Sequence, residues 1–245
     1  MTEQRKFGLF KGPYIRHADS KNNTATMMRD VVIALLPLIL FAWYKNGISP
    51  YIKGDAGFLQ MIYPLLFVVL GGAFCFVTEG LYYLIFLKEQ EVFEKLKLSF
   101  SVIPGILLAM VLPLNTPIWL LAMGCLFATL IGKMVFGGFG YNIFNPALIG
   151  YLFIQTAYLA VINKNGGYLN PTEVTAVTSA TPLTQFFVNN DYKTTLSQYG
   201  GMLNFFVGTI PGSMAETSSL LCLLALVYLL YRRVINWRIP IIYLA

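Results

Sequence analysis

The chain has 245 residues, of which 57% are hydrophobic and only 11% charged, and its mean hydropathy is +0.65. Soluble domains carry roughly 25% charged residues, so this composition excludes an ordinary soluble protein and indicates a membrane protein. The net charge of +6 predicts cations in cytoplasmic loops, and we expect no nucleic-acid partner.

The N-terminal third contains two apolar blocks. Residues 1–26 form a polar, basic arm, which we expect to be cytoplasmic. The first block, 27–44, contains Pro37, which predicts a kink. A short loop, 45–57, is expected before the second block.

The second block, 58–87, is longer than one membrane span requires, so we expect it to tilt or to break near Pro64 or Gly71-Gly72. It also contains Glu79. A carboxylate at membrane depth is costly, which makes Glu79 either a functional residue or a residue that pairs with a neighbouring helix or reaches the interface.

Three further blocks follow a charged connector at 88–97. They cover 98–114, 118–131 and 146–162, and Asn115-Thr116-Pro117 predicts a tight turn between the first two. Residues 27–163 are therefore expected to form five transmembrane helices.

A long and mostly polar segment, 164–205, interrupts the apolar pattern. Residues 206–214 contain glycine and proline and predict a broken or re-entrant segment. A sixth block covers 220–231, and a seventh begins at Ile239 and is cut off at Ala245, which suggests a fragment, a truncated gene product or a frame-interrupted copy. The sequence predicts an all-α polytopic membrane protein with six to seven transmembrane helices, the last truncated.

The distribution of cations predicts the orientation. With the N-terminus inside, all but four of the 17 Lys and Arg residues fall on the cytoplasmic side, and the four outside are Lys45, Lys53, Lys164 and Lys193. This asymmetry follows the positive-inside rule. It places segment 164–205 on the external face.

The cytoplasmic loop at 133–145 combines glycines with two amides. Gly137, Gly138 and Gly140 would let the backbone approach another group closely. Asn142 and Asn145 are three residues apart, which on a helical turn would place both amides on one face, where they could bind a planar heterocycle. The alternative is a helix-capping, re-entrant turn before Pro146.

The cysteines and the histidine do not predict a metal site. Cys75, Cys125 and Cys222 each lie in an apolar block without CxxC spacing, and buried inert thiols are expected. His17 is the only histidine and lies in the basic arm, where a solvated residue is expected.

Four motifs in order carry a resemblance to a known family. They are FGGFGYNIFNPA at 136–147, SATPL at 179–183, PGSMAETS at 211–218 and YRRVINWRIP at 231–240, and YIR at 14–16 with DS at 19–20 adds to them. The chain resembles the family of the D-type subunit of the Rnf complex, an ion-translocating ferredoxin:NAD oxidoreductase. That family is related to the B-type subunit of the sodium-pumping NADH:quinone reductase.

The resemblance implies a covalent FMN, joined to a threonine by a phosphoester and attached by a flavin transferase. The acceptor signature of the family matches at Thr178, Ala180 and Thr181, whereas Thr175 and Ser179 replace its Asp and Gly. The implied acceptor is Thr181, within the cofactor-binding run Thr178, Ser179, Ala180 and Thr181.

The resemblance also implies a second flavin, riboflavin or a similar non-covalent flavin, near an Asn-x-x-Asn-Pro-Ala element. Asn142 and Asn145 match this element, and Gly137, Gly138 and Gly140 would pack against the ring. A flavin at each face would provide an electron route across the membrane.

The function that the resemblance implies is that of a membrane flavoprotein electron-transfer subunit of a redox-driven Na⁺ or H⁺ translocase. Its expected location is the bacterial inner membrane, with other components of the complex and the lipid bilayer as partners and no stand-alone activity. The alternatives are the B-type subunit of the quinone reductase, and a channel or secondary transporter of related fold.

Overall fold

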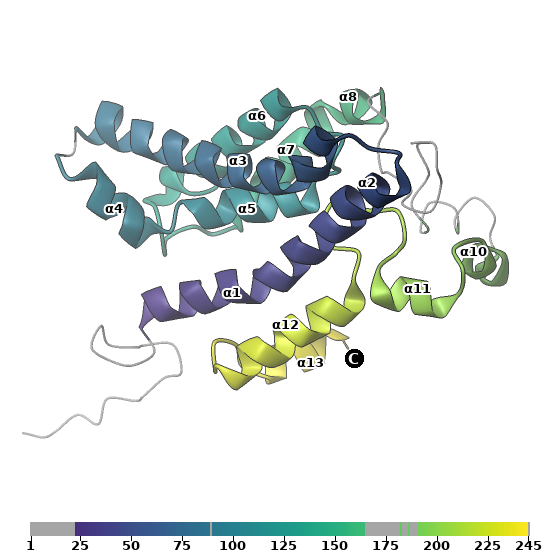
Figure 1. The fold of residues 1–245 in the computed structure, drawn as a ribbon. Helices are drawn as coiled ribbons and strands as arrows, with labels where there is room; N and C mark the ends of the chain where they lie inside the picture. The colour runs from purple at the N-terminus through teal and green to yellow at the C-terminus, as the bar shows by residue number, and fades with distance from the viewer. Residues whose placement is uncertain (1–22, 89, 165–181, 183–185, 187–190, 245) are drawn as a thin grey trace, which may run out of the picture.

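A computed structural model describes residues 23–88, 90–164, 182, 186 and 191–244, and the elements it describes are helices (Figure 1). Most of the basic arm, including His17, lies outside these residues. So does most of the segment expected to carry the covalent flavin.

Six apolar helical stretches correspond to the six predicted blocks. Three are long enough to cross a bilayer: Thr24–Lys53, Phe58–Leu87 and Ile118–Phe136. Three are shorter: Val102–Val111, Pro146–Ala157 and Ser219–Tyr231. The prediction of an all-α, multi-pass membrane protein is confirmed.

The first helix extends beyond its predicted end. α1 (Thr24–Trp43) continues through a π-helical turn, η1 (Tyr44–Ile48), into α2 (Ser49–Lys53). The expected loop from residue 45 is therefore wrong over most of its length. Gly47 has no side chain to clash with the Met61 carbonyl oxygen, so the helix packs directly on the start of the next one.

The second block is one continuous helical rod, formed by α3 (Phe58–Tyr82) and the π-helical turn η2 (Tyr83–Leu87). The expected break does not occur. Pro64 lies inside α3 and is buried by neighbouring helices. The two glycines further along serve helix packing instead.

Two pairs of helices cross at glycines. α5 (Val102–Val111) packs on α3, where a Cβ atom on Gly105 would overlap the carbonyl group of Gly71. α7 (Pro146–Ala157) packs on α6 (Ile118–Leu130), where a Cβ atom on Gly150 would overlap the carbonyl group of Gly124. In a bilayer, helices associate largely through such close backbone contacts.

Gly105→Ala is expected to destabilise the protein by about 1–3 kcal/mol, because the added methyl group meets backbone that cannot rotate away. The matched control is Gly80→Ala in α3, where the nearest atom to a new Cβ is the end of the Leu96 side chain at 3.4 Å. Thermal unfolding in detergent measures both. Equal midpoints for the two variants would contradict the proposed role of Gly105.

Two connecting regions differ from the prediction. The charged connector folds into an amphipathic helix, α4 (Val92–Ser99), which buries Leu96 and Ser99. The fifth block ends at Tyr158 and is followed by a separate short helix, α8 (Leu159–Lys164). The search for continuous apolar blocks did not reveal α4, because only one side of it is apolar.

The C-terminal part wraps around the end of α5. α10 (Tyr192–Gln198) and α11 (Met202–Val207) precede a non-helical segment, 208–218, as expected for a broken segment. Its amides at Met214 and Ala215 donate to the carbonyl oxygens of Leu112 and Met110, each at 3.1 Å. These bonds satisfy groups that a helix end leaves unpaired. Two helices complete the described chain, α12 (Ser219–Tyr231) and α13 (Arg238–Leu244).

The buried core contains two of the three cysteines. Cys75 and Cys125 are fully buried, with Phe67, Leu108 and Ile154 among the core residues. Cys222 is exposed, so the expectation that all three thiols are buried is wrong. The reason is that α12 leaves this side of its apolar surface uncovered by the described residues.

The helical body has two distinct ends. α1 runs between the α3–α7 group and α12 (Figure 1). η1, the end of α5 and segment 208–218 meet at one end. α4, the 133–145 loop and the start of α1 meet at the other. The described loops therefore fall into two groups at opposite ends, while the assignment of one group to the external face stays a prediction.

Candidate functional site

The loop at one end of the body owes its shape to glycine. After the 3₁₀ turn η3 (Met134–Phe136), Gly137, Gly138 and Gly140 have φ angles of 105°, 95° and 91°. Other residues rarely adopt such angles. No atom of the described residues comes within 4 Å of a Cβ placed on Gly140, so conformation rather than crowding requires glycine there.

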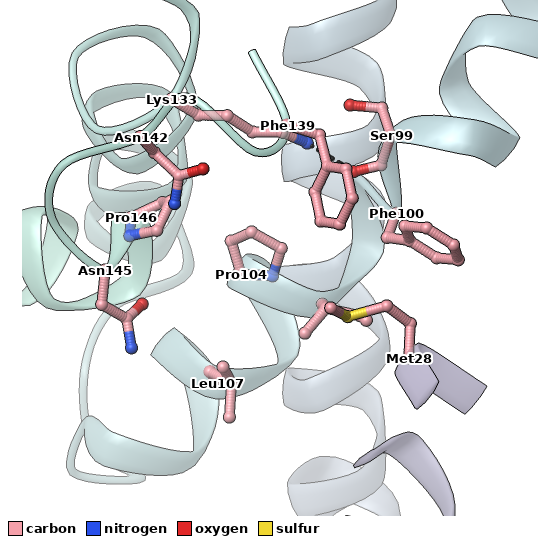
Figure 2. A pocket seen from close by; sticks show the side chains of 11 residues that line it. Met28, Ser99, Phe100, Pro104, Leu107, Lys133, Phe139, Asn142, Asn145 and Pro146 are labelled. Carbon is pink, nitrogen blue, oxygen red and sulfur yellow. Dashed lines mark hydrogen bonds between the residues drawn. The ribbon is translucent and has the colours of Figure 1, made fainter. Parts of the chain in front are cut away.

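The two asparagines lie outside any helical turn. Asn145 is the N-cap of α7, and its Oδ1 accepts from the Ala147 amide at 3.0 Å, while Pro146 begins the helix. The capping interpretation therefore holds for Asn145. Asn142 donates its amide hydrogen to the Phe144 carbonyl oxygen at 3.3 Å. Both side chains nevertheless lie at one cavity (Figure 2).

Each of the two asparagine side chains keeps one polar group that is not used in these bonds. No described residue pairs with the Oδ1 of Asn142, an acceptor, or with the Nδ2 of Asn145, a donor of two hydrogens. The pair can therefore offer one acceptor and one donor to a ligand whose edge carries both kinds of group. The structure brings these predicted residues together at the lip of the cavity.

The cavity has a volume of about 130 Å³. The rings of Phe100 and Phe139 stand at one side of it with their centroids 5.2 Å apart. Phe100 has a φ of 51°, which is strained for an aromatic residue and is often found at functional sites. The lining residues are Met28, Ser99, Phe100, Ile103, Pro104, Leu107, Lys133, Phe139, Asn142, Asn145 and Pro146.

A buried ion pair lies directly behind this cavity. The ammonium of Lys133 is 2.7 Å from Oε2 of Glu79. It also donates to the Ser99 carbonyl oxygen at 2.8 Å (Figure 2). The hydroxyls of Ser99 and Tyr83 both donate to Oε1 of Glu79. Glu79 is fully buried and Lys133 is 2% exposed. Of the two interpretations of Glu79, the structure shows pairing with a neighbouring element.

A second ion pair joins α1 and α12. Arg232, at the end of α12, donates to both carboxylate oxygens of Asp30 in α1 at 3.0 and 3.3 Å. Tyr228 adds a hydroxyl bond at 3.4 Å. The hydrogen bonds to the buried Asp30 carboxylate raise the pKa of the Arg232 guanidinium.

A larger cavity, of about 700 Å³, lies at the opposite end of the body. Pocket volumes of several hundred Å³ are typical of sites for small molecules and cofactors. Partial burial raises the pKa of Glu216, the one carboxyl residue among the described residues that line it. The lining residues are Pro182, Phe186, Tyr192, Thr195, Leu196, Phe205, Ile210, Pro211, Gly212, Ser213, Glu216, Thr217 and Ser219.

The predicted flavin-attachment residues lie outside the described part of the chain. These are Thr178, Ser179, Ala180 and Thr181. Pro182, the residue that follows them, is described and is buried in the wall of the larger cavity. The role of these four residues stays a prediction.

Sequence reasoning missed Lys133 and Lys45 as buried residues. Both were counted as loop cations, but they are only 2% and 5% exposed. For Lys133 a signal was available, because Glu79 at membrane depth requires a cationic partner. For Lys45 there was none, since its surroundings in the sequence resemble those of the exposed Lys53.

These features define a class: a multi-pass helical membrane protein with a cavity at each end of its body and a buried ion pair behind one of them. The model of the NQR2, RnfD, RnfE family matches residues 12–245. The chain therefore belongs to this family.

Three curated relatives illustrate the match. The D-type subunit of the Na⁺-translocating ferredoxin:NAD⁺ oxidoreductase complex of Acetobacterium woodii is 31% identical over 93% of this chain and 64% of its own length. The D-type subunit of the proton-translocating complex of Clostridium ljungdahlii is 30% identical over 96% of this chain and 66% of its own length. The B-type subunit of the Na⁺-translocating NADH-quinone reductase of Yersinia pestis is 34% identical over 78% and 43%. The chain thus spans less than two thirds of the length of these relatives.

Proposed function

We propose that the chain is a membrane flavoprotein subunit of an Rnf-type complex, which couples electron transfer between ferredoxin and NAD to the translocation of Na⁺ or H⁺. The family match over residues 12–245 carries this proposal, because two relatives are named as the D-type subunits of such complexes. The protein has no activity alone and works with the other components of the complex in the bacterial inner membrane.

The first flavin is FMN, bound covalently through Thr181 after attachment by a flavin transferase, with Thr178, Ser179 and Ala180 beside it. Support comes from the larger cavity, whose wall begins at Pro182 and includes Tyr192 and Phe205. Its volume suits a cofactor. A flavin supplies the electron chemistry, while these residues bind and shield it. The orientation that we propose places this cavity on the external face.

The second flavin is non-covalent and binds at Asn142 and Asn145, with the backbone at Gly137, Gly138 and Gly140 beside it. The unpaired donor and acceptor of the two amides support this. The cavity of about 130 Å³ is smaller than most ligand sites. Binding of a flavin ring therefore requires this cavity to widen.

Detection of a covalently bound flavin tests the proposal most directly. We expect the full chain, produced together with the flavin transferase and then denatured, to fluoresce in a gel. A non-fluorescent band would contradict a covalent flavoprotein.

Asn145→Asp is expected to remove the non-covalent flavin while α7 remains folded. The carboxylate keeps the oxygen that caps the Ala147 amide but loses the Nδ2 donor and adds a negative charge. The matched control is Asn236→Asp, because Asn236 caps the Arg238 amide in the same way at 3.2 Å. Flavin released on mild denaturation measures the effect. Equal flavin release from both variants would argue against the site.

The B-type subunit of the sodium-pumping NADH:quinone reductase is the second candidate. The Yersinia pestis relative of that name is 34% identical over 194 residues. Membranes that contain the assembled complex discriminate between the two. Ferredoxin-dependent NAD⁺ reduction favours the first candidate, and NADH-dependent quinone reduction favours the second.

A further inference from the structure

Lys45 is a buried cation without an acidic partner. It lies in η1 and is 5% exposed. No carboxylate of the described residues comes within ion-pair distance of its ammonium. A charge held in a low-dielectric site is costly unless an opposite charge compensates it. An anion that reached this ammonium would offset the cost of burying its charge.

Both hydrogen bonds of Lys45 lead to the larger cavity. Its Nζ donates to the Ile210 carbonyl oxygen at 2.7 Å and to the Thr217 hydroxyl oxygen at 2.9 Å. Ile210 and Thr217 both line that cavity. The positive charge of Lys45 thus lies directly behind the part of the cavity wall that segment 208–218 forms.

The Thr217 hydroxyl can transmit the electrostatic effect of Lys45 to the cavity. Its oxygen accepts from an ammonium, so its own hydrogen is left to donate, and it has no acceptor among the described residues. A hydroxyl polarised by a cation is a stronger donor than a neutral one. Glu216, the carboxyl residue among the described residues of the lining, is not paired with Lys45.

We propose that Lys45, through the Thr217 hydroxyl, makes the larger cavity an anion site that stabilises the reduced, anionic ring of the flavin attached to Thr181. This inference rests on the proposed function. Lys45 acts as a positioning residue and a source of charge, and Thr217 provides the contact. Reduction of the oxidised ring by two electrons and one proton leaves one negative charge on it, which the Lys45 charge offsets.

The test is a redox titration of the full chain, produced with the flavin transferase and reduced with dithionite, followed by flavin absorbance. The same titration of Thr181→Ala isolates the tethered flavin by difference. Lys45→Met should lower the equilibrium constant for two-electron reduction roughly tenfold, which lowers the midpoint potential by about 30 mV. Thr217→Val should shift it in the same direction by less.

Conservative variants and a control separate charge from structure. Lys45→Arg and Thr217→Ser keep the charge and the hydroxyl and should keep the wild-type potential. Lys53→Met removes an exposed cation of α2 and should also leave it unchanged. A wild-type potential in Lys45→Met, or an equal shift in Lys53→Met, overturns the inference.

The outcome remains decisive if Lys45→Met loses its flavin. In that case Thr217→Val and Thr217→Ser decide, and equal potentials for the two overturn the inference. Absence of covalent flavin from the wild-type chain is a different outcome, because it contradicts the proposed function itself and not only the role of Lys45.

Discussion

Thr181→Ala is expected to abolish the covalent flavin fluorescence of the denatured chain completely. A phosphoester needs a hydroxyl oxygen, and alanine has none. Thr181→Ser retains a hydroxyl and should retain part of the signal. In-gel fluorescence of protein made together with the flavin transferase measures all three forms, with immunoblotting to equalise the amounts of protein.

Thr178→Ala is the matched control for this assignment. It removes a hydroxyl from the same run of residues but leaves the proposed acceptor in place, so at least part of the fluorescence should remain. Equal loss in Thr178→Ala and Thr181→Ala would contradict the choice of Thr181.

Glu79→Gln is expected to destabilise the folded protein by about 3–5 kcal/mol, because it leaves the buried ammonium of Lys133 without its counter-charge. Glutamine has nearly the same shape as glutamate, so the change removes mainly charge. The measurement is the thermal midpoint of the detergent-solubilised protein, followed by size-exclusion chromatography after heating.

Two further variants make this expectation specific. Glu79→Gln combined with Lys133→Met removes both charges and should recover most of the stability. Glu94→Gln breaks the exposed pair of Glu94 and Lys97, which is 3.0 Å long, and should cost less than about 1 kcal/mol. A double variant as unstable as Glu79→Gln would show that the pair contributes more than charge compensation.

The positions of the transmembrane blocks could be predicted from composition because a bilayer requires long apolar helices. The places where a helix breaks within such a block could not be predicted in this way. Pro64 and Gly71 suggested a broken helix, yet α3 is continuous. A proline is tolerated where neighbouring helices bury it, and a glycine where another backbone approaches it. Both conditions depend on neighbours that are distant in the sequence.

The candidate site was predictable only in part. The spacing of Asn142 and Asn145 marked the loop, and the structure places both at one cavity. The helical turn expected for them is absent, because Asn145 caps the helix that Pro146 begins. Lys133 belongs to the same loop, but nothing in the local pattern placed Ser99 beside it, since α4 runs from the charged connector into the predicted third block and ends with Ser99 at the site.

The sequence by itself determined the class of the protein, the approximate spans and the family resemblance, because apolar blocks, cation asymmetry and ordered motifs are local properties. Only the tertiary structure decided which charges are buried. The sequence does not distinguish Lys45, Lys53 and Lys133 from one another. In the structure Lys45 and Lys133 are buried, whereas Lys53 is exposed. The cost of a charge depends on the dielectric and the partners around it, and folding alone assembles these.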